Sequence, residues 1–359
     1  MRLVADSGLW TTGPLTTPSP LLAVLEVSGA VLSWTVDDVT ESQITFTDVA
    51  RADWLWRVVG ESGHSAVASM LTGRSAVDSV EVVDVNLLPG ALEPLRRLAL
   101  GHWLRRWWPA SQRDAIPVLD SAILDAEVAL LTAAAQDYFG DDTFDSELTH
   151  LLAPHAAALN AAVLEGDPRI GALVERCRNV ADDIGVALDA EPVTKRRDDY
   201  ALAAGAEAGG RGAGVIAGGT ASINWGAVPP GIFDAAEGAV DWTVELDGDV
   251  VNGMIGAELT GLGSPHGIAV RLQSGTVGGA GALGADGRAA VPLVDPQRRP
   301  ITEPAAWNHD WRDTTVIVGV DVAESVQTRE RVRAFARFRL RQPVADAFLA
   351  EILAAESDY

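Results

Sequence analysis

The residues from 331 to 341 combine arginines with apolar residues in a regular alternation. The arginines are Arg331, Arg333, Arg337, Arg339 and Arg341, and the apolar residues are Val332, Ala334, Ala336, Phe338 and Leu340. A period of two is typical of an extended strand, which places the guanidinium groups on one face and the apolar side chains on the other. The pattern therefore predicts a late strand whose apolar side faces a hydrophobic core and whose cationic side requires anionic partners.

The net charge of the chain indicates which partner this cationic face has. The chain carries 50 Asp and Glu residues against 27 Lys and Arg, which gives a formal net charge of -23. Guanidinium groups close together repel one another unless carboxylates lie opposite them, and an acidic chain has carboxylates available. We expect an internal or subunit contact made of salt bridges, and an external anionic ligand is the alternative.

A second candidate site is the predicted loop from 307 to 313. Its sequence is Trp307-Asn308-His309-Asp310-Trp311-Arg312-Asp313. Tryptophans can stack on a peptide or a sugar while His309, Asp310 and Arg312 form hydrogen bonds, and loops between strands often carry binding residues. Alternatively, the two tryptophans close one end of a β-domain. The sequence leaves both interpretations open.

One segment resembles part of a catalytic motif. Gly63-His64-Ser65-Ala66-Val67 is similar to the start of the Gly-x-Ser-x-Gly nucleophile elbow of α/β-hydrolases, but Val67 replaces the second glycine. A β-branched residue resists that crowded turn, and the preceding residues look helical rather than extended. We expect a break between helices, and a serine hydrolase that uses Ser65 remains an alternative.

Other kinds of chemistry are excluded by scarce residue types. The only lysine is Lys195, which does not follow a glycine, so no phosphate-binding P-loop is present. Cys177 is the only cysteine, which excludes zinc or iron-sulfur sites that need several thiolates. Glu147 and His150 have the spacing of half a di-metal site, but no second half appears. We therefore predict neither a metal site nor a cofactor.

Composition indicates a soluble, globular protein. The chain has 359 residues, of which 48% are hydrophobic, enough for two or three domains. Its negative charge disfavours binding to nucleic acid and to anionic membranes. No apolar run approaches the roughly 20 residues of a spanning helix, and no signal peptide is recognisable. Together with the single cysteine, these features predict a cytoplasmic protein.

The first half of the chain should be a mixed α+β region, residues 1–90, followed by a helical bundle, residues 91–200. Two apolar runs flank Ser28-Gly29, a turn signal that predicts a β-hairpin. Later segments end at glycine or proline after apolar residues at helical spacing, and Asp167-Pro168 predicts the start of the last helix in the bundle.

The second half should be an antiparallel β-sandwich with a short helix after it. Residues 201–222 are rich in glycine without apolar periodicity, which predicts a flexible linker. Short β-branched runs separated by turn dipeptides predict the sandwich over residues 223–342, with Asp247-Gly248 as one hairpin turn. A helix should follow within residues 343–359. The predicted fold is therefore a multidomain α+β protein.

These features favour a non-catalytic adaptor or assembly component that binds other proteins through its sandwich and its Arg and Trp surfaces. Arg and Trp are enriched at interface hot spots, and the sequence shows no complete catalytic constellation. Two alternatives remain: an enzyme of unfamiliar type, and a peptide or small-ligand binding protein. The sequence does not predict an oligomeric state.

Overall fold

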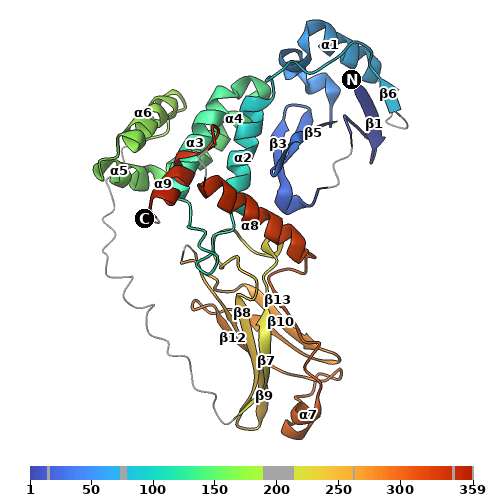
Figure 1. The fold of residues 1–359 in the computed structure, drawn as a ribbon, viewed down its shortest axis with the longest axis vertical. Helices are drawn as coiled ribbons and strands as arrows, with labels where there is room; N and C mark the ends of the chain where they lie inside the picture. Colours follow the sequence, from blue (N-terminus) through green and yellow to red (C-terminus); the bar gives the residue numbers. More distant parts are fainter. Residues whose placement is uncertain (14–16, 73–78, 189–213, 262, 342–343, 358–359) are drawn as a thin grey trace. The chain divides into compact units, whose positions relative to one another are not determined.

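The computed structural model describes residues 1–13, 17–72, 79–188, 214–261, 263–341 and 344–357 (Figure 1). Helices and antiparallel sheets occur together, so the predicted α+β class is confirmed. Packing divides the chain into two compact units. The first comprises Met1–Arg106, Leu119–Thr194 and Arg337–Tyr359, and the second comprises Trp107–Val118 and Lys195–Ala336.

The first unit contains a six-stranded antiparallel sheet. Its described strands follow the order β3-β4-β5-β2-β1-β6, which makes β3 and β6 the edge strands. The strands are β1 (Arg2–Asp6), β2 (Leu9–Thr11), β3 (Leu22–Val27), β4 (Ala30–Thr35), β5 (Asp38–Phe46) and β6 (Ser79–Glu81).

The predicted hairpin is present as β3 and β4. Val27 pairs with Ala30 across the turn Ser28-Gly29. Gly29 has a φ of 74°, and a Cβ at this position would collide with the carbonyl oxygen of Asp48. Only glycine therefore fits the turn without displacing the backbone that follows β5.

Helices complete the first unit. They are α1 (Trp56–Leu71), α2 (Glu93–Trp107), α3 (Ser121–Ala134), α4 (Asp141–Leu152), α5 (Ala156–Leu164), α6 (Pro168–Asp183) and α9 (Leu349–Ser357). As predicted, Asp167 caps α6 by accepting a hydrogen bond from the Arg169 amide at 2.8 Å, with Pro168 as the first helical residue. Among the described residues, no helix combines the length and apolar character that a bilayer span requires.

The second unit contains two antiparallel sheets. One has the order β12-β9-β8-β7 and the other β11-β10-β13. The strands are β7 (Val215–Ala221), β8 (Val240–Asp247), β9 (Val250–Ala257), β10 (Ala269–Ser274), β11 (Val277–Ala282), β12 (Arg288–Pro292) and β13 (Thr315–Val318). Trp242 and Ile255 of the first sheet share one hydrophobic core with Leu272 and Val316 of the second, as in a sandwich.

The predicted strand from 331 to 341 is wrong. Val326–Arg341 forms one helix, α8, whose residues up to Ala336 belong to the second unit and the remainder to the first. The Ser325 hydroxyl caps the helix by accepting a hydrogen bond from the Thr328 amide at 3.0 Å. Arginine, alanine and leucine also favour a helix. Over a short stretch, a period of two and a helical period select some of the same positions, so the alternation alone does not distinguish a strand from a helix.

The faces of this segment are therefore not those of a strand. Val332 and Ala336, at helical spacing, are fully buried, whereas Phe338 is 51% exposed and Ala334 is also exposed. Arg333 and Arg339, which a strand would place on the outer face, are buried.

The Gly-rich linker predicted over 201–222 is wrong in its last part. Val215–Ala221 forms β7 and pairs with β8, where Gly219 lets the strand approach the Trp242 ring closely. Residues 201–213 lie outside the described part of the chain. The predicted segments 1–90 and 343–359, with most of 91–200, contribute to the same compact unit.

Candidate functional site

Two arginines of α8 are ion-paired inside the second unit. Arg329 donates two hydrogen bonds to the carboxylate of Glu237, both at 2.9 Å, and Arg333 donates to the same group at 3.0 Å. Arg333 also lies 3.3 Å from Asp114. Burial by itself would raise the pKa of Glu237, but hydrogen bonds from Arg329, Ser222 and Arg333 lower this pKa to about 2.

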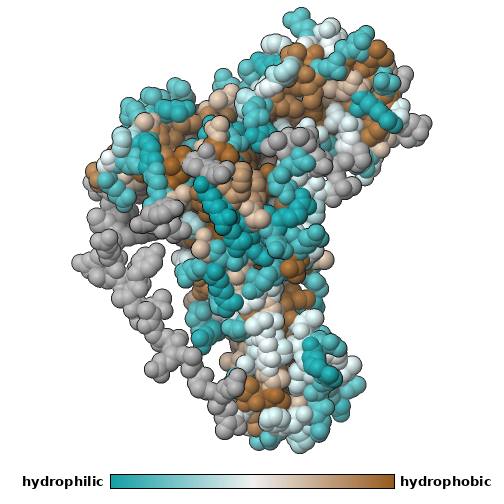
Figure 2. Space-filling view, viewed as in Figure 1, coloured by the Kyte–Doolittle hydropathy of each residue, from teal (hydrophilic) through white to brown (hydrophobic). Residues whose placement is uncertain are grey.

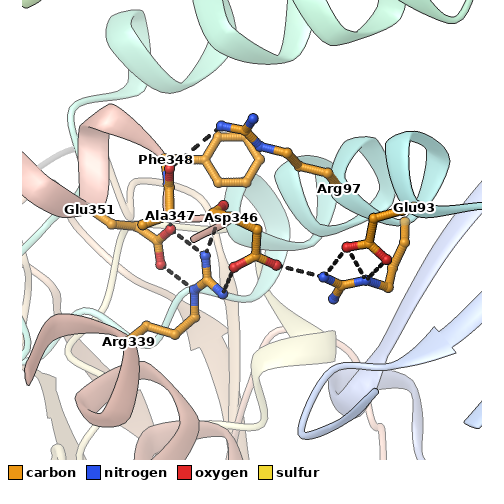
Figure 3. Close-up of polar contacts among 8 residues, drawn as sticks. Glu93, Arg97, Arg339, Asp346, Ala347, Phe348 and Glu351 are labelled. Atoms are coloured by element: carbon orange, nitrogen blue, oxygen red, sulfur yellow. Dashed lines mark hydrogen bonds and ion pairs between the residues drawn. The ribbon is translucent and has the colours of Figure 1, made fainter. Parts of the chain in front are cut away.

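Arg339 is ion-paired inside the first unit. Its guanidinium donates to Glu351 at 2.6 Å and to Asp346 at 3.1 Å (Figure 3). Asp346 also accepts from Arg96. Burial opposes the charged form of Arg339, but Glu351 and Asp346 raise its pKa. Arg333 and Arg339 therefore have the internal salt bridges expected of the predicted cationic face.

The other predicted arginines lie nearer the surface. Arg331 and Arg341 are exposed and Arg337 is half-buried. The surface over α8 is largely hydrophilic in Figure 2. The helix thus separates five arginines that the sequence predicts on one face.

The predicted binding loop is divided between core and surface. Trp307 lies in the short helix α7 (Glu303–Asn308) and is 55% exposed, whereas Trp311 is buried and its indole donates to the Ala306 carbonyl at 2.9 Å. The His309 ring packs edge-on against Trp311 and lies 3.0 Å from the hydroxyl of buried Ser274. Trp311 therefore belongs to the hydrophobic core of the second unit, and His309 packs against it.

The exposed charges of this loop bind each other. Arg312 donates a bidentate hydrogen bond to Asp310, and these bonds lower the pKa of Asp310 to about 2. Of the residues predicted here for binding, Trp307 retains a large apolar surface accessible to a ligand.

Ser65 does not occupy a nucleophile elbow. It is an exposed residue inside α1, and the break in this helix lies at Gly60, which has a φ of 77° and a ψ of 164°. A serine in the middle of a helix lacks the strand-to-helix turn that exposes a nucleophile. The break expected at residues 63–67 is therefore wrong in its position, because it lies at Gly60, five residues before the serine.

A cavity of about 630 Å³ lies beside the edge strand β3 in the first unit. Val24 to Gly29 line one side, and residues from α2, α3, α4 and the segment before α4 line the other. The side chains opposite the strand belong to His102, Thr132, Phe139, Phe144, Ser146 and Glu147, with Thr47 and Arg51 at the turn. This volume falls within the range of about 300 to 1,000 Å³ typical of ligand sites.

The edge of β3 presents backbone groups to this cavity. Residues that flank a two-residue turn exchange both ladder hydrogen bonds, so Val27, Leu25 and Ala23 bond to β4. The amide and carbonyl groups of Val24 and Glu26 then point toward the open edge. Among the described residues, no backbone group outside the sheet bonds to either of them. The side chains of Val24 and Glu26 are exposed.

A chain of polar side chains begins at His102 on the cavity wall. Asp125 of α3 accepts a hydrogen bond from Arg105 at 2.6 Å and lies 3.0 Å from His155, while Arg105 lies 3.4 Å from the His102 ring. Burial lowers the pKa of His102, and Arg105 lowers it further. His102 is therefore neutral near pH 7, while Asp125 neutralises Arg105.

The sequence gives little indication of this cavity. Glu147, His150 and His155 suggest a metal cluster in the sequence, but His150 is exposed and His155 pairs with Asp125. The β3–β4 hairpin is predictable, but the edge position of β3 depends on the order of all six strands. Among the described residues, no group of three or more His, Cys, Asp and Glu side chains is arranged to hold a metal ion.

Comparison with protein-family models, curated proteins and solved structures found no match for this chain.

Proposed function

We propose that this protein is a non-catalytic adaptor or assembly component that binds a partner protein by accepting an extended segment of it as an additional strand on β3. The observation that carries this proposal is an open strand edge lining a cavity of about 630 Å³. In binding of this kind, main-chain hydrogen bonds provide affinity and adjacent pockets for side chains provide specificity.

The position of β3 supports this use. A free edge with an exposed valine is prone to unwanted pairing, and proteins usually shield such edges with charge, proline or a covering element. Here Glu26 supplies one charge, and the facing residues of α4 leave a cavity instead of covering the strand. The edge is thus accessible to one segment, while the cavity walls restrict lateral growth.

The proposed partner surface differs from the Arg and Trp surfaces that the sequence predicts. Arg333 and Arg339 are engaged in internal salt bridges, and Trp311 belongs to a hydrophobic core. The backbone of β3 has no such internal partner on its outer side among the described residues. A contact built on backbone groups also leaves no residue-type pattern in the sequence.

The test is a selection of peptides from a random-sequence library on the full-length protein, followed by affinity measurements with variants. Val24→Pro removes the outward amide and places a ring at the edge, and proline is tolerated on edge strands. Val24→Thr keeps the amide and the β-branched shape and serves as the matched control. Circular dichroism and thermal unfolding establish that both variants fold.

We expect Val24→Pro to weaken peptide binding at least about tenfold and Val24→Thr to change it little. Equal affinity of the parent and Val24→Pro would contradict the proposal, as would a failure to select any peptide. If Val24→Pro does not fold, the same comparison is made with a peptide N-methylated at alternate residues, which cannot donate to the carbonyl groups of Val24 and Glu26.

A further inference from the structure

We propose that the cavity beside β3 selects a lysine or arginine side chain of the docked segment, an inference that rests on the proposed function. The candidate subsite is the part of the cavity formed by Phe139, Phe144 and Glu147 opposite Glu26. Its chemistry combines aromatic rings with carboxylates, and both stabilise a cation.

The charges on the cavity wall favour a basic occupant. Among the described lining residues, Glu26 and Glu147 are acidic and Arg51 is basic. His102 adds no positive charge near pH 7, because burial and the neighbouring Arg105 lower its pKa. An acidic side chain would face two carboxylates, whereas a basic one adds the missing positive charge.

Arg105, which lies next to His102, does not compensate the negative charges of Glu26 and Glu147. Arg105 donates to both oxygens of Asp125, at 2.6 and 3.3 Å, and is therefore already neutralised. Glu147 and His102 both line the cavity, and the Glu147 carboxylate raises the pKa of His102 less than burial and Arg105 lower it.

The aromatic rings add a second preference. Phe139 and Phe144 are half-buried, and both line the cavity. The methylene stem of lysine or arginine packs on such rings, and the cationic end interacts with a ring face within about 6 Å. A long basic side chain satisfies the apolar and acidic parts of the wall together.

The charge of the whole chain acts in the same direction. A formal net charge of -23 attracts basic segments and repels acidic ones before contact. This long-range attraction is not specific to the cavity, so the experiment must separate it from recognition inside the cavity.

The experiment uses the peptides selected on the full-length protein. The lysine or arginine that does not vary among the selected peptides is replaced by norleucine, glutamine and glutamate. Each peptide is then titrated against the parent protein and against Glu147→Gln. Glu61→Gln is the matched control, because Glu61 is an exposed residue of α1 outside the cavity and the substitution changes the net charge equally.

We expect norleucine to weaken binding to the parent about tenfold and to weaken binding to Glu147→Gln much less, while Glu61→Gln behaves as the parent. If norleucine and lysine peptides bind equally well but Val24→Pro still abolishes binding, this inference is wrong and the proposed function stands. Selected peptides without a basic residue would also overturn it. If no peptide binds, both proposals fail.

Discussion

At the scale of single residues, the stability of the second unit depends on two buried arginines that share one carboxylate. Arg329 and Arg333 are both almost completely buried, and both bind Glu237. Removing the shared anion leaves two buried cations with fewer partners, which is strongly destabilising even where the intact network contributes little.

We therefore expect Glu237→Gln to lower the free energy of unfolding by about 3 kcal/mol. The measurement is urea denaturation at pH 7. Asp310→Asn, which breaks the exposed pair with Arg312, is the control and should change stability far less than Glu237→Gln does. A loss of the same size in both variants would contradict the role assigned to Glu237.

The acid side of the stability profile should also depend on Glu237. Its pKa is lowered to about 2 in the folded state from an ordinary value of 4.5, so the folded protein holds this proton less tightly than the unfolded chain. The resulting stabilisation is present above pH 4.5 and is lost as the pH falls toward 2. In Glu237→Gln the unfolding free energy should decline less steeply over this window.

In the first unit, the contribution of Glu127 to stability depends on pH in the opposite direction. It accepts hydrogen bonds from the first amides of α9, at 2.6 Å from Leu349, yet burial raises its pKa to about 7. Between pH 4.5 and 7 the folded state binds more protons than the unfolded state, so stability falls as the pH rises. The groups facing Glu127 are Arg97, Glu351 and these helix amides.

We predict that Glu127→Gln removes this decline. The parent should lose up to about 3 kcal/mol between pH 4.5 and 7 from this residue, and the variant should be nearly constant after subtraction of the remaining groups. Denaturation at several pH values measures both curves. Parallel curves for parent and variant would show that Glu127 titrates normally.

At the scale of elements, two helical glycines test how tightly the first unit is packed. A Cβ at Gly101 of α2 would lie 2.6 Å from Val128 of α3 and 3.1 Å from the Phe348 ring. Gly171 of α6 has no atom within 4 Å of the same position. The two positions therefore separate packing from helix propensity.

Gly101→Ala should destabilise the protein by about 1 to 3 kcal/mol, because the three elements must move apart. Gly171→Ala should be neutral or stabilising by up to about 1 kcal/mol, because alanine favours the helix. Thermal unfolding of both variants provides the comparison. Stabilisation by Gly101→Ala would contradict the close packing of α2 against α3 and Phe348 that the structure shows.

Elements marked by local signals were predictable from the sequence. The β3–β4 hairpin has its glycine turn, and α6 has Asp167 and Pro168 at its start. The predicted β8–β9 hairpin is present, but its turn is Gly248-Asp249, one residue later than the predicted Asp247-Gly248, because Asp247 still pairs with Val250. The last helix, expected within residues 343–359, begins at Leu349, where Glu127 caps it from a distant part of the sequence. A cap supplied by another element leaves no local signal.

Helix α8 shows why regular spacing can mislead. Thr328, Arg329, Val332, Arg333, Ala336 and Arg339 form its buried face, and three of these six are arginines. Because burial of arginine depends on carboxylates outside the helix, a pattern that assigns arginine to the surface cannot find this face. The cap at Ser325 was the local signal that could have identified the helix.

At the scale of the whole molecule, each compact unit is built from stretches that are not consecutive in the sequence. The first unit is assembled from three separate stretches of the chain and the second from two. Composition divides a sequence only into consecutive segments, so it could predict the α+β class but not this grouping. The candidate site was unpredictable for the same reason, because β3, α2, α3 and α4 meet there only after folding.

The central claim is that a partner segment pairs with the outer edge of β3. Site-resolved amide hydrogen exchange of the full-length protein, free and saturated with a selected peptide, tests it most directly. In the free protein the amides of Val24 and Glu26 should exchange faster than those of Ala23 and Leu25, which bond to β4. We predict that the peptide slows exchange at Val24 and Glu26 and changes Ala23 and Leu25 little. Protection located elsewhere, with Val24 and Glu26 unchanged, would contradict the claim.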